Sequence, residues 1–392
     1  MLKKTHPRLL DKYLLVDLYE TGIMSDLKID KIEAYKLDVP YKEPILVAYA
    51  KYFDTKNVIV KVHANGIVGY GEASGSAGFS GETQNSLLGA FSVMATRLVG
   101  MDPFDIGLVH GIMDETIGNG AMKAALDEAL YDVMGKKTDL PIHKLLGGLQ
   151  HRKIPTQRAV TIRSPAEMAK EAAAFVAEGF MTFEVKVGLE PERDVERVKA
   201  VREATGNDAV LIVDANIGWT PMQAIRVLRR VEKYDVLAEQ PTKGVRNLAE
   251  VRRAVNMPII ADESCYTPED ALEVIRADAA DILSIKILKC GGYYKAKQIA
   301  AIAEANDMPY RVDDMAVTVL GNTASLQLAA SCRDIVGCGF LQHRFLAQDK
   351  NPVIRGGLSV ERGDVIVPTG SGLGLEINDK MLGKPVEVFA KS

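Results

Sequence analysis

The chain has 392 residues, of which 47% are hydrophobic and 26% are charged, and its formal net charge is −4. This length accommodates one large domain or two ordinary ones, and the composition is typical of a globular protein with a substantial core. The slightly acidic balance argues against nucleic acid as a partner, and the absence of a long uninterrupted apolar run predicts no membrane-spanning helix.

The N-terminus and the cysteines bear on the compartment. Residues 1–26 begin with lysines and continue with leucines, as a signal peptide would, but charged residues interrupt the apolar stretch and no small-x-small cleavage site follows. We predict an amphipathic N-terminal extension there. The four cysteines lack a CxxC pair or a zinc-binding spacing, which is typical of a reduced, cytoplasmic protein.

Residues 27–150 are predicted to form a small α+β domain. Residues 28–74 contain apolar runs that alternate as antiparallel strands do, and the sequence ANG at residues 64–66 is a hairpin signal between two of them. Residues 82–148 change to apolar positions at helical spacing. Strands followed by helices indicate an α+β domain.

Residues 151–350 are predicted to form a (β/α)8 barrel. Eight apolar runs alternate with amphipathic helices: IPTQRAVTI, MTFEVKVG, AVLIVDAN, DVLAEQP, MPIIADES, ADILSIKI, MPYRVDD and DIVGCGF. The runs lack alternation because strands of a parallel sheet are buried on both faces. Eight βα units in succession indicate a TIM-type barrel. Residues 351–392 contain no further βα unit and are expected to return to the first domain, which would cap the barrel.

The ends of these strands carry the candidate catalytic residues, because active sites of such barrels lie at the C-terminal ends of the strands. Strands two to seven end in Lys186, Asp214, Glu239, Asp262, Lys286 and the pair Asp313 and Asp314. The intervals between the first five are each close to one βα repeat. These side chains are therefore predicted to share one level at the barrel mouth.

The carboxylates Asp214, Glu239 and Asp262 on three adjacent strands indicate a metal site. They cannot all be ionised close together without a cation, and oxygen ligands that leave positions for water or substrate suit Mg²⁺. For any one of them, the alternative is a cap on the following helix. Coincidence on three consecutive strands is a poor explanation, so we predict one Mg²⁺ per subunit.

The two lysines, Lys186 and Lys286, indicate proton transfer. Their strands are four apart in an eight-stranded barrel, so the side chains face each other across the mouth. A nearby cation and a second lysine favour the neutral amine, which can act as a base. A carboxylate substrate on Mg²⁺ can then lose its α-proton and form a stabilised enolate.

This ordered set of motifs resembles the enolase superfamily, in its mandelate racemase/muconate lactonizing enzyme family, over about residues 27–385. The motifs are AALDEALYDVMGK, LPIHKLLGG, VKVG, VDAN, AEQP, DES and KILKCGG. The resemblance implies Mg²⁺ on Asp214, Glu239 and Asp262, with Lys186 and Lys286 as bases. It also implies capping loops near 44–52 and 74–80, and a homo-oligomer, either a dimer or an octamer.

Two positions depart from the family pattern. The muconate lactonizing-like subgroup usually has K-x-K on strand two, whereas this chain has Glu184 in place of the first lysine. A glutamate there is expected to be a neighbour of Lys186 that can keep it protonated. Val317 stands where strand seven usually carries a glutamate. The Asp-x-Asp of dipeptide epimerases is also missing from VGCGFLQHRF, which disfavours that activity.

The substrate contacts are expected from the same resemblance. The pair Asp313 and Asp314, with the C-terminal segment, resembles the branch acting on hydroxyproline betaine and related cyclic amino-acid derivatives. One of these aspartates would face the substrate nitrogen, although helix capping is an equally good reading of each. Tyr52 is a further candidate contact, and Asn216 of VDAN a supporting residue. Met315 would hold a quaternary ammonium less well than an aromatic residue, which favours another amino acid.

Three functions remain open. The first is Mg²⁺-dependent racemisation or epimerisation of an amino acid or an N-substituted, proline-type derivative. The second is a lyase-type reaction on the same enolate, either dehydration of a hydroxy-amino acid or muconate-type cycloisomerisation. The third is a metal-binding scaffold without turnover, which Glu184 and Val317 keep open.

Overall fold

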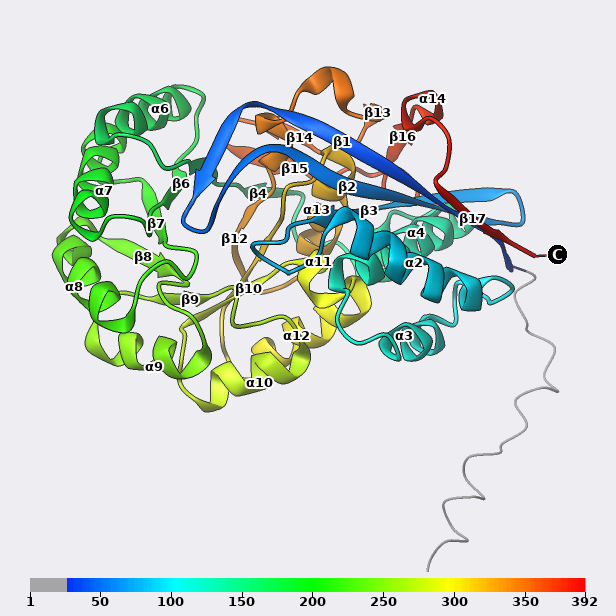
Figure 1. Cartoon of the computed structure of the whole chain (residues 1–392), viewed down its shortest axis with the longest axis horizontal. Helices are drawn as coiled ribbons and strands as arrows, with labels where there is room; N and C mark the ends of the chain where they lie inside the picture. The colour runs from blue at the N-terminus through cyan, green and yellow to red at the C-terminus, as the bar shows by residue number, and fades with distance from the viewer. Residues whose placement is uncertain (1–26, 392) are drawn as a thin grey trace, which may run out of the picture.

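The computed structural model describes residues 27–391, so the N-terminal extension predicted at residues 1–26 lies outside the described residues. An antiparallel sheet with helices on one side leans over a parallel barrel (Figure 1). The long hairpin of the first two strands reaches from the sheet across the barrel. Among the described residues, no helix is both long and apolar enough to cross a membrane.

The capping sheet has the strand order β17-β1-β2-β3. Its strands are β1 (Ile29–Val47), β2 (Ala50–Ala64), β3 (Ile67–Gly75) and β17 (Glu387–Ala390). Asn65 and Gly66 connect β2 to β3 with φ angles of 46° and 81°. A two-residue hairpin of this kind needs positive φ at both positions, which explains why ANG was a correct hairpin signal.

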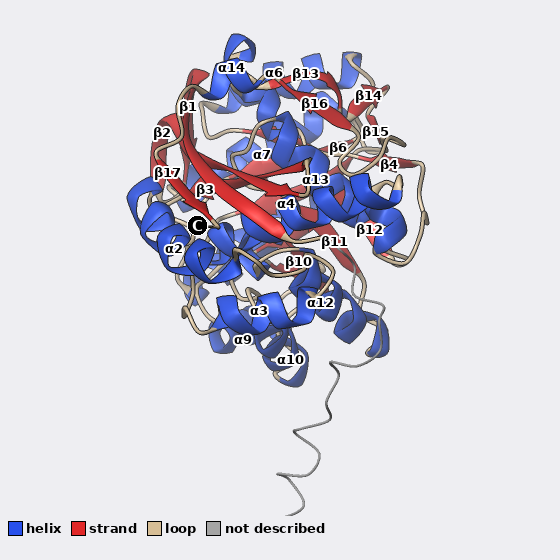
Figure 2. Ribbon diagram, turned by 90° about the vertical axis from the view of Figure 1, so that its right-hand side faces the viewer, coloured by secondary structure: helices blue, strands red, loops and turns tan. Residues whose placement is uncertain are grey.

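Four helices complete the capping region: α2 (Gln84–Leu98), α3 (Ile106–Asp114), α4 (Gly120–Thr138) and α5 (Ile142–Leu145). Helix α4 lies against β3 (Figure 2). A Cβ atom on Gly71 of β3 would lie 2.0 Å from the carbonyl oxygen of Ala125, so glycine is required for this close approach. The helix is buried along most of its length, which makes it the centre of the capping core.

The barrel is an eight-stranded parallel sheet in which each strand neighbours the next in sequence. Its strands are β5 (Arg158–Val160), β6 (Thr182–Lys186), β7 (Val210–Asp214), β8 (Val236–Glu239), β9 (Ile259–Ala261), β10 (Ile282–Ile285), β11 (Tyr310–Asp313) and β12 (Ile335–Gly339). An isolated bridge between Thr156, just before β5, and Cys338 of β12 joins the two ends of the sheet, so the barrel is nearly closed. The predicted fold class is confirmed.

Helices surround the barrel strands on the outside (Figures 1 and 2). They are α6 (Pro165–Ala177), α7 (Pro191–Thr205), α8 (Pro221–Val231), α9 (Val245–Ala254), α10 (Pro268–Arg276), α11 (Ile287–Cys290), α12 (Tyr293–Ala305) and α13 (Val319–Ala330). Helices α6, α8 and α10 begin in the same way, with proline in the first turn and a capping box at Ser164, Thr220 or Thr267. These caps satisfy amide donors and therefore fix where each helix starts.

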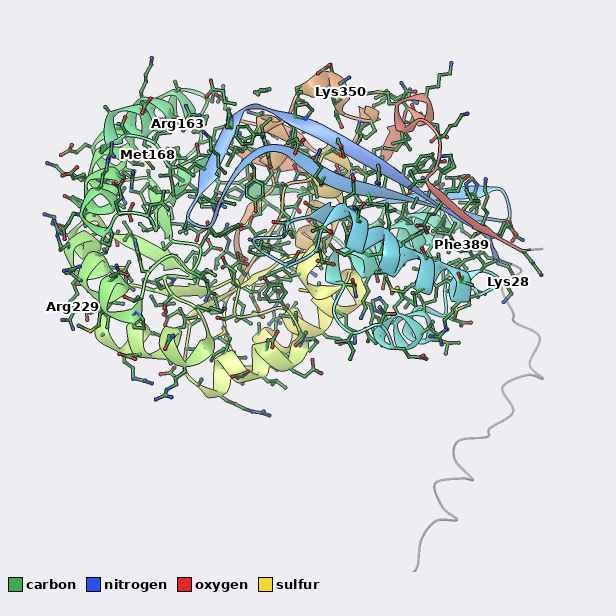
Figure 3. The ribbon with its side chains drawn as sticks, viewed as in Figure 1. Lys28, Arg163, Met168, Arg229, Lys350 and Phe389 are labelled. Carbon is green, nitrogen blue, oxygen red and sulfur yellow. The ribbon has the colours of Figure 1, made fainter. Side chains whose placement is uncertain are left out.

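The C-terminal segment contacts both parts of the molecule. Its other elements are β13 (Val353–Gly356), β14 (Ser359–Glu361), β15 (Asp364–Ile366), β16 (Leu375–Ile377) and α14 (Asp379–Leu382). Strand β15 pairs with β4 (Lys153–Pro155) beside the barrel, whereas β17 pairs with β1 in the capping sheet. Phe389 of β17 lies at this sheet, and its ring centroid is 5.8 Å from that of Phe91 (Figure 3).

A buried carboxylate joins the capping domain to the barrel. Glu72 of β3 is fully buried and accepts hydrogen bonds from the backbone amides of Thr318 and Gly321, at the start of α13. The Thr318 hydroxyl (2.7 Å) and the Asn57 side-chain amide (2.7 Å) donate to the same carboxylate. Negative charge at a helix N-terminus is favourable, so this contact holds the cap above the strand-seven side of the barrel.

We expect Glu72→Ala to lower the free energy of unfolding by at least about 3 kcal/mol, because it leaves several buried donors without a partner. Urea unfolding followed by circular dichroism measures this difference. Glu203→Ala is the control, because Glu203 is exposed and its ion pair to Lys199 is 3.7 Å long. A loss from Glu72→Ala no larger than that of the control would contradict the role of Glu72 as a clamp.

Candidate active site

The register of the strands brings the predicted residues together. Lys186 of β6 pairs with Asp214 of β7, which pairs with Glu239 of β8. Asp262 and Lys286 directly follow β9 and β10. The five side chains therefore lie at the C-terminal end of the barrel, as the spacing of the strand ends predicted.

The buried carboxylates include a group suited to a metal ion. One oxygen from each of Glu184, Asp214 and Glu239 lies within 4.8 Å of one from each of the others. All three residues are buried. Burial raises the pKa of Glu239 well above its ordinary value; Arg311 opposes this effect, whereas Asp214 and Asp262 add to it. A hard divalent cation would offset this repulsion, so the donor set fits Mg²⁺.

Lys186 is held by two of these carboxylates. Its Nζ atom donates to Glu184 Oε1 at 2.8 Å and to Asp214 Oδ2 at 2.5 Å. Burial acts to lower the pKa of Lys186, but Asp214 and Glu184 outweigh it and raise the pKa well above the ordinary value. The pairing between Glu184 and Lys186 anticipated from the sequence is present, and the two carboxylates favour the ammonium form of the lysine over the neutral amine.

Lys286 and Asp262 form a second buried group. Asp262 accepts from Lys286 Nζ through Oδ2 and from Lys289 Nζ through Oδ1, both at 2.6 Å. Burial acts to raise the pKa of Asp262, but the two lysines hold it far below its ordinary value. Both oxygens of Asp262 are thus engaged by lysines, and Asp262 lies outside the group formed by Glu184, Asp214 and Glu239.

Three residues that the sequence interpretation did not select support the site. Lys289 is fully buried and also donates to the backbone of Asp262 and Ser284. Arg311 contacts Glu239 at 3.2 Å, and the side chain of Gln240 accepts from the amide of Asp262 at 2.9 Å. The sequence contains a signal that could have identified two of these residues. Lys289 is a charged residue within the apolar stretch 282–290, and Arg311 lies two residues before Asp313, on the same face of its strand.

Both predicted capping loops line the cavity above these residues. Tyr49 and Tyr52 come from the first loop and Phe79 from the second, and they face Lys186 and Lys286 across one pocket. The Tyr52 hydroxyl is 3.3 Å from Ser76 Oγ, which links the two loops. The Phe79 ring lies 4.8 Å from Lys286 Nζ. The capping domain thus roofs the site with aromatic side chains.

The aspartate pair on β11 is divided between two surroundings. Asp314 lines the cavity, but its carboxylate accepts from the Asn322 side chain at 2.6 Å and from the Met315 amide at 2.8 Å. Asp313 lies 3.4 Å from Arg311 and 3.9 Å from Lys286. Both carboxylates already have partners within the protein, so a substrate contact from either one remains a prediction.

Asn216 lies between the carboxylates and the cavity. It lines the pocket, and its backbone has a φ of 41°, an uncommon conformation for a residue other than glycine. The backbone amide of Asn216 donates to Asp214 Oδ1 at 2.8 Å, and its side-chain amide donates to Glu263 at 3.2 Å. Asn216 therefore contacts Asp214, and the supporting role expected for it stays a prediction.

The fold and this arrangement of lysines and carboxylates define a member of the enolase superfamily. Residues 31–147 match the family model for the mandelate racemase/muconate lactonizing enzyme N-terminal domain, and residues 167–381 match the enolase C-terminal domain-like model. The chain belongs to this family, as its motifs indicated.

Known relatives include enzymes of several kinds. The N-succinyl-L-Arg/Lys racemase of Bacillus cereus is 32% identical over 91% of this chain and 97% of its own, and its crystal structure superimposes with a TM-score of 0.88. A dipeptide epimerase from Cytophaga hutchinsonii, solved with Mg and D-Ala-L-Val, has a TM-score of 0.87 at 34% identity, covering 92% of this chain and 99% of that one. A cis-3-hydroxy-L-proline dehydratase from Roseibium aggregatum is 30% identical over 93% of this chain and 100% of its own.

Proposed function

We propose that the protein is a Mg²⁺-dependent racemase or epimerase of an amino acid or an N-substituted amino acid. The observation that carries this proposal is that Lys186 and Lys286 line one cavity from strands four apart in the barrel. Two bases on opposite faces of a substrate are what inversion at an α-carbon requires. One lysine would remove the α-proton and the other would return a proton to the opposite face.

Asp214 and Glu239, with Asp262 as the third residue implied by the family, would hold the cation. When bound, the ion would supply positive charge that stabilises the negative charge developing on the substrate carboxylate. The protein side chains do the proton transfer. Phe79 and the tyrosines of the capping loops line the cavity beside the lysines, where they would limit the access of water and lower the local dielectric around the reacting carbon.

The relatives support the reaction class and the breadth of substrates. Racemisation of N-succinylated amino acids acts on a carbon that carries a carboxylate and an acylated nitrogen, and so does epimerisation at the C-terminal residue of a dipeptide. We infer a substrate of this kind, including the proline-type derivatives suggested by the aspartate pair on β11. A dehydratase among the relatives keeps a lyase reaction as the second candidate, because elimination starts from removal of the same α-proton.

The experiment is deuterium exchange with Mg²⁺ in D₂O, followed by proton NMR. The panel contains both enantiomers of proline and its betaine, hydroxyprolines, N-succinyl and N-acetyl amino acids, and several dipeptides. Loss of the α-proton signal with appearance of the other stereoisomer supports a racemase. New carbon signals would support a lyase. Binding of Mg²⁺ without exchange in any compound would instead favour the metal-binding scaffold.

We also propose a cytoplasmic location and a homo-oligomer. The four cysteines are buried free thiols, which suits a reducing compartment. The dimer or octamer expected from the family stays a prediction. Sedimentation velocity of the purified chain distinguishes these two assemblies from a monomer.

A further inference from the structure

Glu184 occupies a position that the family pattern assigns to a lysine, and the exchange replaces a positive charge by a negative one at the barrel mouth. Glu184 lies two residues before Lys186 on β6, so both side chains point to the same face of the strand, into the barrel. We propose that Glu184 is a direct ligand of the divalent cation, together with Asp214 and Glu239. Glu184 would thus take the place among the ligands that the family pattern gives to Asp262.

The arrangement of the oxygen atoms supports this assignment. Glu184, Asp214 and Glu239 form the acidic group whose oxygens approach within 4.8 Å of one another. Glu184 is 2% exposed and Glu239 is 0% exposed, so neither is solvated. Glu184 Oε2 and Glu239 Oε1 are buried and accept no hydrogen bond within the part of the chain that the structure describes. Buried carboxylate oxygens without partners are costly unless a cation satisfies them.

Asp262 differs from Glu184 in this respect. Each of its oxygens accepts a hydrogen bond of 2.6 Å from a lysine. Lys289, one of these donors, is completely buried and is fixed by two backbone carbonyls as well. Asp262 therefore has its charge balanced within the protein, whereas Glu184 and Glu239 each keep an oxygen available.

Cation binding at this group would also change the position of Lys186. The Lys186 ammonium now contacts Glu184 and Asp214, which are two of the three proposed ligands. A divalent ion that takes these carboxylates would displace the ammonium from between them. The side chain would then turn toward the cavity that it already lines. Metal loading and the placement of Lys186 against substrate are thereby coupled through Glu184.

The inference rests on the proposed function only in taking a divalent cation to bind at the barrel mouth. The test therefore measures binding of Mg²⁺ and Mn²⁺ to the full chain without substrate. Mg²⁺ affinity is measured by calorimetry, and the number of exchangeable waters on bound Mn²⁺ by water-proton relaxation. The variants are Glu184→Ala and Glu184→Gln. The control is Glu263→Gln, because Glu263 is a partly buried carboxylate at this end of the barrel but lies outside the acidic group.

Loss of a ligand should weaken Mg²⁺ binding at least about tenfold in Glu184→Ala and add one exchangeable water to Mn²⁺. Glu184→Gln should weaken binding as well, and Glu263→Gln should leave the water number unchanged. Equal affinities in Glu184→Gln and the control, with no added water, would overturn the assignment. Because Gln is nearly isosteric with Glu, this variant keeps the test valid if Glu184→Ala does not fold. Absence of cation binding by the unmodified chain would overturn the metal in the proposed function as well.

Discussion

Lys186→Ala and Lys286→Ala are each expected to abolish net racemisation while each variant still exchanges the α-proton of one enantiomer. The lysines approach the cavity from strands β6 and β10, on opposite sides of the barrel. Each can reach only one face of a substrate held between them. Each lysine is the base that deprotonates one enantiomer and the acid that completes inversion of the other. Removal of one lysine therefore eliminates both of these steps. The enantiomer still served by the remaining lysine can lose its proton and regain a deuteron on the same face.

The expected loss of racemisation is about a hundredfold to ten-thousandfold, which is the usual contribution of a positioned general base. Proton NMR in D₂O with each pure enantiomer measures exchange, and polarimetry measures inversion. Lys243→Ala is a suitable control, because Lys243 is an exposed lysine in the loop that follows β8, at the same end of the barrel. If both active-site variants lost exchange with both enantiomers, the two-base mechanism would be wrong and a single-base lyase would be favoured.

Chelation of divalent cations is expected to reduce α-proton exchange at least about a thousandfold without unfolding the protein. A cation next to a developing carboxylate charge contributes several kcal/mol to catalysis, and its removal carries that penalty. The fold should survive because the buried carboxylates have cationic partners within the protein. Lys186 contacts Asp214, Arg311 contacts Glu239, and Lys289 contacts Asp262.

The measurement combines exchange in EDTA with the far-ultraviolet circular dichroism spectrum of the same sample, before and after Mg²⁺ is restored. Recovery of exchange by Mg²⁺, with the spectrum unchanged throughout, is the expected result. Asp214→Asn is the matched variant, because it keeps the volume of the side chain and removes its charge. Exchange that persists in EDTA would show that the lysines act without a metal, and loss of the helical spectrum would show that the ion is structural.

Much of the fold could be predicted because the pattern is local. Parallel strands that are buried on both faces give apolar runs, and helices between them give amphipathic segments, so the eight βα units are visible in the sequence. Asn65 and Gly66 illustrate the same point for the capping hairpin, since their positive φ angles suit the turn that the sequence ANG predicted. Strand ends could be located within a residue or two, and this was sufficient to select the two lysines and three carboxylates.

Apart from the pair of Glu184 and Lys186, the partners of these side chains could not be predicted from the sequence. Arg311 contacts Glu239, which lies 72 residues away along the chain, and Lys289 contacts Asp262, which lies 27 residues away. Such contacts depend on the stagger between strands and on the path of each side chain, which no local pattern encodes. Asp314 is a further case, because its bond to Asn322 depends on how α13 follows β11.

The sequence by itself determined the barrel, its cap, and the residues that stand at the C-terminal ends of the strands. Those features follow from the period of apolar residues and from the direction that parallel strands share. Only the tertiary structure decided most of the charge pairs. It assigned Asp262 to Lys286 and Lys289, and it placed Arg311 against Glu239. The physical reason is that electrostatic interactions in a buried site depend on separations of a few ångströms between residues far apart in the chain, and folding alone sets those separations.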